Sequence, residues 1–131
     1  MIMLDTQVLV WWVENSNRLS DSHKSVIDAS ERDGLRASAI SIWEIAMLVS
    51  KRRLDVGMLV SSWLDKVLAI PTLHIVAATP QILVNSTELP GSFHPDPADR
   101  IVVATARAYE EPLLTTDRKI LAYAHVRSVG P

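Results

Sequence analysis

The stretch Met1-Ile-Met-Leu-Asp-Thr6 opens the chain with an apolar run that stops at a carboxylate and a hydroxyl. A short run without polar alternation is typical of a strand in the middle of a parallel sheet. We therefore interpret Ile2–Leu4 as a central strand and Asp5 as the first residue beyond its carboxyl end. Because α/β proteins bind their ligands at this edge of the sheet, Asp5 is the first candidate for a functional group.

Beyond this run the sequence alternates short apolar stretches with amphipathic ones, which is the pattern of an α/β fold. Strands are expected near residues 2–4, 35–37, 73–76, 113–115 and 126–129. Helices are expected at 6–12 with Thr6 as the cap, from Ser20 to before Gly34, at 41–52, at 58–69, from Pro80 onward, at 99–110 and at 118–123. No repeat or linker interrupts this order, so we expect a single domain over residues 1–131. The predicted architecture is a three-layer sandwich, in which helices flank a central parallel sheet of about five strands.

Composition narrows the class of protein. Hydrophobic residues make up 48% of the 131 residues, which is too many for a disordered chain. The absence of cysteine excludes disulfides and thiolate metal sites, and it fits a reducing cytoplasm. The net charge of −2 predicts no strongly basic surface. The apolar run Val8–Val13 is too short to span a membrane and no signal peptide is evident, so we expect a cytoplasmic protein without a membrane partner.

Three further acids occupy places comparable to that of Asp5. Glu44 and Asp99 each lie near the start of an expected helix, and Asp117 follows an expected strand. If the strands are parallel, these side chains meet at one edge of the sheet. Carboxylates that crowd together repel each other unless a cation lies among them, and hard cations such as Mg²⁺ and Mn²⁺ prefer oxygen ligands. The pattern therefore predicts a divalent metal site.

Helix capping is the competing explanation for each acid taken singly, because Asp, Ser and Thr at a helix start accept backbone N–H bonds. Asp96 is a better cap than Asp99, since Pro97 fits the first helical position. That choice leaves Asp99 free to point into a cleft. Glu44 is likewise free of a capping role if Ser38, rather than Ser41, caps its helix.

Other chemistries find little support. The histidines lack zinc-like spacing, and we interpret His74 as structural and give His94 little weight. Neither a phosphate-binding glycine loop nor a nucleophile elbow is present. A receiver or phosphatase domain fits poorly, because those folds place two nearby acids after the first strand, whereas Thr6 and Gln7 follow Asp5 here.

Four segments together resemble those of PIN-domain ribonucleases, and in particular the VapC-like toxins of type II toxin–antitoxin pairs. They occur in the family's order, and the resemblance covers essentially the whole chain; the segments are Met3–Thr6, Ser38–Ala46, Asp96–Ala106 and Leu113–Asp117. The resemblance implies a PIN-like fold with an acidic quartet that binds metal and catalyses, namely Asp5, Glu44, Asp99 and Asp117. Asp96 is an additional acid of the same motif and a possible further ligand.

The resemblance implies a metal-dependent endoribonuclease, in which Mg²⁺ or Mn²⁺ activates water to hydrolyse an RNA phosphodiester. It assigns Thr6 and Thr116 to substrate-binding positions beside the acids. Because Arg118 and Lys119 follow the last acid, we also expect them to contact RNA phosphates. The alternative function is a PIN-like module that binds RNA or protein without cutting, and the complete quartet argues against it.

The same resemblance implies two protein partners, a small antitoxin and a second copy of the chain. Trp11 and Trp12 are adjacent, so one helix cannot bury both on the same face, and we expect one inside and the other half-exposed. We expect Trp43 and Trp63 to add apolar surface for a partner. The homodimer is expected to use helices that span residues 41–53 and 58–69.

Overall fold

The computed structural model describes residues 1–131 and contains one five-stranded sheet in the order β3-β2-β1-β4-β5. Every neighbouring pair of strands is parallel, which confirms the predicted sheet. The strands are β1 (Ile2–Leu4), β2 (Leu35–Ser38), β3 (Leu73–Val76), β4 (Leu113–Leu114) and β5 (Ser128–Val129). The first strand in the sequence is thus the central strand of the sheet, as its uninterrupted apolar run predicted.

Seven helices accompany the strands and correspond to the seven expected ones, with shifted ends. Their bounds are α1 (Thr6–Val13), α2 (Asp21–Ser30), α3 (Ala39–Ser50), α4 (Val60–Leu68), α5 (Pro80–Thr87), α6 (Pro97–Tyr109) and α7 (Arg118–Leu121). Ser20, Thr79 and Asp96 cap their helices as the sequence indicated, and Ser38 rather than Ser41 caps α3. The prediction that Thr6 caps the first helix was wrong, because Asp5 is the capping residue and Thr6 is already helical.

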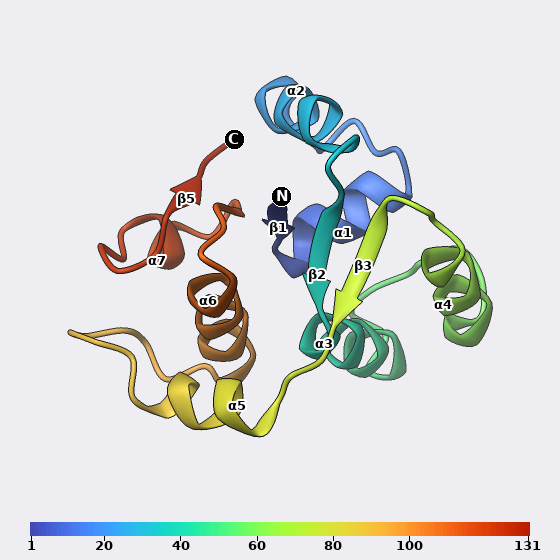
Figure 1. The fold of residues 1–131 in the computed structure, drawn as a ribbon. Coiled ribbons are helices and arrows are strands. Elements are labelled where there is room, and N and C mark those ends of the chain that lie inside the picture. Colours follow the sequence, from blue (N-terminus) through green and yellow to red (C-terminus); the bar gives the residue numbers. More distant parts are fainter.

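Side chains of successive strand residues enter two separate cores. Ile2 and Leu4 belong to a cluster of 15 buried residues, whereas Met3 belongs to a second cluster of 10. Leu114 and Leu113 divide in the same way, as the two-residue period of a strand requires. The first core contains side chains of α1–α4, and the second contains side chains of α5–α7. Figure 1 shows α7 beside β5 and α4 beyond β3, and the two cores show that helices cover both faces of the sheet, so the predicted sandwich is confirmed.

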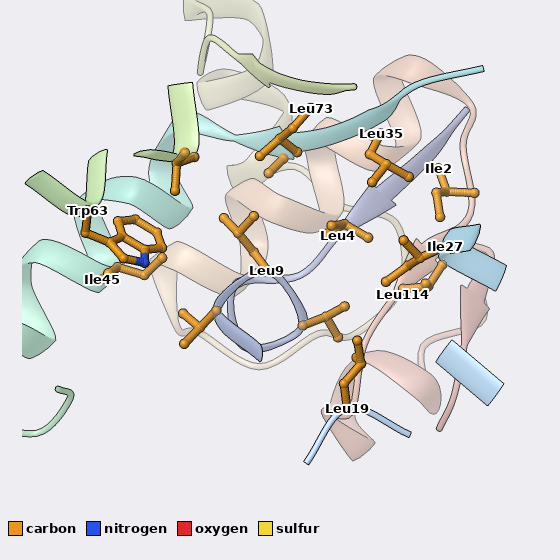
Figure 2. Packing of buried hydrophobic residues seen from close by; sticks show 14 of the residues in the cluster. Ile2, Leu4, Leu9, Leu19, Ile27, Leu35, Ile45, Trp63, Leu73 and Leu114 are labelled. Atoms are coloured by element: carbon orange, nitrogen blue, oxygen red, sulfur yellow. The ribbon is translucent and has the colours of Figure 1, made fainter. Parts of the chain in front are cut away.

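The four tryptophans have different environments. Trp63 of α4 is 1% exposed in the first core, where it lies beside Ile45 of α3 (Figure 2), while Trp43 is 56% exposed. The expectation that Trp63 adds to the apolar surface was therefore wrong. Trp11 and Trp12 are both half-buried against the first core, so neither is fully inside.

The expectation for His74 also needs correction. His74 was interpreted as a structural residue of an apolar strand, but its side chain is exposed. It lies on β3, which is an edge strand and has a neighbour on one side only. No helix of the structure is long and apolar enough to cross a membrane.

Truncation of Trp63 tests the described core. Trp63→Ala should lower the free energy of unfolding by about 3–5 kcal/mol, because a large buried side chain leaves a cavity. Trp43→Ala removes the same atoms from an exposed position and should change the free energy of unfolding by less than about 0.5 kcal/mol. Urea denaturation of both variants measures the difference. Equal losses in the two variants would contradict the contrast in burial.

Candidate metal centre

Asp5 lies at the carboxyl end of the central strand and is held on three sides. Its backbone N–H donates to the carbonyl oxygen of Leu114 at 2.9 Å, which continues the pairing of β1 with β4. Its Oδ1 accepts from the backbone N–H of Thr6 at 2.8 Å, and its Oδ2 accepts from the hydroxyl of Thr115 at 2.6 Å. With only 7% of the residue exposed, this carboxylate has a fixed position at the base of the site.

Thr115 links two of the predicted acids, and sequence reasoning missed it. Its hydroxyl donates to Asp5 and accepts from the backbone N–H of Asp117 at 3.0 Å. The register of the two strands explains this contact, because Leu4 pairs with Leu114 and the next residues along are Asp5 and Thr115. The sequence signal that could have identified Thr115 was a hydroxyl residue directly after a strand that pairs with β1.

The two threonines that the sequence singled out have other surroundings. The hydroxyl of Thr6 donates to the hydroxyl of Ser41 at 2.8 Å, which ties the start of α1 to α3. Thr116 is half-buried, and its hydroxyl forms no hydrogen bond within the protein. A role for Thr6 or Thr116 in substrate binding therefore stays a prediction.

Glu44 is free of a capping role because α3 begins earlier than the sequence suggested. Ser38 caps this helix through the backbone N–H of Ile40, so Glu44 lies beyond its first turn. The side chain is half-buried, and its charge raises the pKa of both Asp5 and Asp99. The structure thus brings Glu44 into electrostatic contact with the other acids.

Asp96 and Asp99 divide the roles at the start of α6 as predicted. Oδ1 of Asp96 accepts from the backbone N–H of Asp99 at 3.1 Å, and Pro97 occupies the first helical position. Asp99 is left with its carboxylate free of any capping bond. Asp96 itself is exposed and acts on Asp99 through its charge.

Asp117 caps α7 and still faces the other acids. Its Oδ1 accepts from the backbone N–H of Lys119 at 2.7 Å and, more weakly, from that of Ile120 at 3.4 Å. Ligand atoms of Asp117, Asp99 and His94 all lie within 4.8 Å of one another. This trio is compact enough to hold a metal ion, and it includes a histidine to which the sequence gave little weight.

Burial and mutual repulsion make the site reluctant to carry its full negative charge. Burial is the largest cause that raises the pKa of Asp5 to about 6, and it outweighs the lowering by the bonds from Thr115 and Thr6. Burial also raises the pKa of Asp99 to about 7, followed by repulsion from Asp5 and then from the remaining acids. Near neutral pH the site therefore takes up protons or a cation.

The loop before α6 is held by Arg100, the residue after Asp99. Its guanidinium donates to the carbonyl oxygens of Phe93 at 3.0 Å, His94 at 3.3 Å and Ser86 at 2.8 Å. These three bonds give Arg100 a structural role. It fixes the backbone at His94 beside the acids.

The chain matches the PIN domain family model over residues 2–126. It is a member of the PIN domain family. It is 34% identical to ribonuclease VapC22 of Mycobacterium tuberculosis over 128 residues, which cover 98% of this chain and 95% of that protein.

Solved structures of the same fold include two toxin–antitoxin complexes. DNA-bound VapBC from Salmonella typhimurium aligns with a TM-score of 0.71 and 13% identity, over 99% of this chain and 98% of that chain. VapBC2 from Rickettsia felis, bound to a promoter DNA fragment, aligns with a TM-score of 0.67 and 19% identity, over the same shares of the two chains. The fold of this PIN domain is thus the fold of those chains.

The raised pKa values predict how stability depends on pH. In the metal-free protein the folded state keeps protons on Asp5 and Asp99 that the unfolded chain releases near pH 4. The free energy of unfolding should therefore fall as pH rises from about 4 to about 7. For Asp5 alone the shift corresponds to a loss on the order of 3 kcal/mol. Urea denaturation in EDTA at pH 5 and pH 8 measures the part of this loss that occurs above pH 5.

Asp99→Asn removes one of the two raised groups and one repelling charge. The metal-free variant should be at least as stable as the wild type at pH 8, and its loss between pH 5 and pH 8 should be smaller. Asp65→Asn changes an exposed aspartate of α4 and should keep the pH dependence of the wild type. If Asp99→Asn is clearly less stable than the wild type at pH 8, the Asp99 carboxylate stabilises the folded protein, which contradicts the prediction.

Proposed function

We propose that this PIN domain is the ribonuclease toxin of a toxin–antitoxin pair, and that it hydrolyses RNA phosphodiesters with water activated by a divalent cation. One observation carries the proposal. Four acids from different elements gather at the carboxyl edge of the sheet, and two of them, Asp5 and Asp99, have raised pKa values because they are buried and repelled. The likeness to ribonuclease VapC22 supports the same reaction. The cytoplasm is the proposed location, because the proposed substrate is RNA.

The residues of the site fit a hard divalent cation, for which Mg²⁺ or Mn²⁺ is the proposed ion. Carboxylate oxygens are its preferred ligands, and a cation removes the repulsion among the acids. The proposed ligands are Asp5, Glu44, Asp99 and Asp117, with Asp96 adding charge beside them. When bound, the cation lowers the pKa of a water molecule and stabilises negative charge on the phosphoryl oxygens.

The chain's own contribution is to hold these acids in place before substrate arrives. Thr115 fixes Asp5 and the backbone of Asp117 through one hydroxyl. Asp96 takes the capping bond at the start of α6 and so leaves Asp99 free. Groups that are fixed in advance need no reorganisation when charge develops on the phosphate, and this is the largest source of catalysis in most such sites.

Cleavage of a mixed RNA substrate tests the reaction. Asp99→Asn should abolish metal-dependent cleavage while leaving the fold intact. Loss of a group that only supports a metal ligand costs about 10–100-fold in affinity or activity, so loss of a proposed ligand should cost at least that much. Excess EDTA should stop the wild type, and Asp65→Asn should cleave normally.

The alternative function, which is binding without catalysis, predicts that no RNA is cleaved. A PIN-like module without catalysis would retain RNA in the presence of Mg²⁺ or Mn²⁺ and leave it uncut. Full activity of Asp99→Asn, or activity that persists in EDTA, would instead show that the acids do not hold a required metal.

The RNA is proposed to cross the surface beside α7. Arg118 and Lys119 are exposed at the start of this helix, directly after Asp117. Lys119 also lines an open hollow of about 380 Å³ together with the rings of Phe93, His94 and Tyr123. Aromatic rings next to a cation suit a nucleotide, because bases stack on such rings and phosphates pair with the charge.

Salt dependence of RNA binding tests this path. The double change Arg118→Gln and Lys119→Gln, made on an Asp99→Asn background so that RNA stays intact, should weaken binding. It should also reduce the slope of log affinity against log salt by about 1–2, since each phosphate contact releases about one counterion. Arg32→Gln with Lys66→Gln neutralises two exposed cations elsewhere and should leave the slope unchanged. Equal slopes in all proteins would make Arg118 and Lys119 ordinary surface.

The proposed protein partners are a small antitoxin and a second copy of this chain. Apolar side chains remain exposed on and just before the two helices expected in the dimer, namely Trp43 of α3 and Met58, Leu59 and Leu68 at α4. Trp11 and Trp12, each half-buried on α1, leave apolar surface for an amphipathic segment of the antitoxin.

A further inference from the structure

We propose that Nε2 of His94 is a nitrogen ligand of the cation at the acidic edge, and that it makes this site prefer Mn²⁺ over Mg²⁺. The inference rests on the proposed function, because it adds a ligand to the metal site proposed there. It departs from the all-carboxylate quartet that the family resemblance implied. The observations that carry it concern one atom, its neighbours and the loop that holds it.

Nε2 of His94 is shielded from solvent and has no hydrogen-bond partner. It lies only 3.1 Å from Oδ2 of Asp99, yet the two atoms are not aligned as donor and acceptor in a hydrogen bond. A shielded polar atom without a partner is costly in a native protein and calls for a missing group. The two atoms form an ion pair when the imidazole is protonated, and without a proton on Nε2 both can face a common third atom.

The spacing agrees with shared coordination. In an octahedral site with ligands about 2.1 Å from the ion, neighbouring ligand atoms are about 3 Å apart and opposite ones about 4.2 Å. The distance of 3.1 Å between His94 and Asp99 matches neighbouring ligands. The ligand atoms of His94, Asp99 and Asp117 all lie within 4.8 Å of one another, so the three are close enough to share one ion.

The position of His94 is fixed by contacts on both sides of its loop. Arg100 of α6 bonds to the backbone carbonyls of Phe93 and His94. The ring of Phe93 packs at 4.4 Å from that of His94 and at 4.8 Å from that of Tyr123, measured between ring centres. The hydroxyl of Tyr123 donates to the carbonyl oxygen of Pro90. These contacts fix the conformation of the loop, and the loop holds the histidine next to Asp99. A chance contact between two surface side chains would lack this support.

A nitrogen ligand changes which ion the site favours. Mg²⁺ is bound almost entirely by oxygen, whereas imidazole is a common ligand of transition-metal ions. Mn²⁺ binds carboxylates as Mg²⁺ does and also accepts imidazole nitrogen. A site with both oxygen and nitrogen ligands therefore favours Mn²⁺. The nitrogen must carry no proton when it binds, which leaves the ring proton on Nδ1.

Mn²⁺ itself is the probe for the test. We would titrate metal-free wild type, His94→Ala and His94→Gln with Mn²⁺ and with Mg²⁺ by calorimetry, and check each fold by circular dichroism. His94→Ala and His94→Gln should lose about tenfold or more in Mn²⁺ affinity and less in Mg²⁺ affinity. His74→Ala, which removes an exposed histidine of β3, should bind both ions as the wild type does.

Electron spin echo modulation of the Mn²⁺ complex gives a direct readout that needs no activity. The wild type and His74→Ala should show coupling of Mn²⁺ to a histidine nitrogen, and His94→Ala should lose it. Absence of nitrogen coupling in the wild type, or its persistence in His94→Ala, overturns the proposal while leaving the carboxylate site intact. If the wild type binds neither ion, the metal site of the proposed function fails together with the inference.

Discussion

The burial of Asp5 at the end of the central strand is the constraint on which the site depends. This carboxylate is almost fully enclosed, and burial raises its pKa to about 6 despite hydrogen bonds from Thr6 and Thr115 that favour the charged form. A charge in that position disfavours every further negative charge nearby. Asp5 is, after burial, the strongest cause of the raised pKa of Asp99. The fold thus brings negative charges together in a buried place, and only protons or a cation can relieve their repulsion.

Two of the proposed metal ligands also cap helices, and each uses one carboxylate oxygen for the capping bond. Asp5 and Asp117 each use Oδ1 to cap a helix, which stabilises α1 and α7. Their other oxygens face neighbouring groups, and Oδ2 of Asp5 accepts from Thr115. Capping and metal binding are therefore not alternatives for these residues. Helix starts with partial positive charge also help to keep the acids ionised in a place that otherwise opposes it.

Sequence alone was enough to place the acids, because parallel strands bring their carboxyl ends to one edge whatever their details. The apolar run Ile2–Leu4 identified the central strand, and the pair Asp96-Pro97 identified the start of α6. These inferences depend only on the chemistry of a few neighbouring residues. The two-residue period of strands then determined which side chains enter which core.

What the sequence could not show depends on contacts between distant segments. Thr115 reaches Asp5 only because β4 pairs with β1 in one register, and a shift by one residue would turn its hydroxyl to the other face. Trp63 lies on α4 and Trp43 on α3, and only the packing of the helices against the sheet decides that the first is buried and the second exposed. His94 belongs to a loop without a regular pattern, so no periodicity could indicate where its ring points.

The link between Asp99 and Arg100 explains how that loop becomes part of the site. Adjacent residues of a helix point about 100° apart, so one helical turn can serve two surroundings at once. Asp99 faces the acids, while Arg100 turns to the carbonyls of the loop and holds His94 against the same carboxylate. Any movement of α6 carries the acid and the loop together. The distance between Asp99 and His94 is therefore set within one rigid unit, whereas the distances from Asp99 to Asp5 and Glu44 depend on how α6 packs against the sheet and α3. A cation that bound all of the proposed ligands would stabilise that packing, and metal binding would then be coupled to the arrangement of the second core.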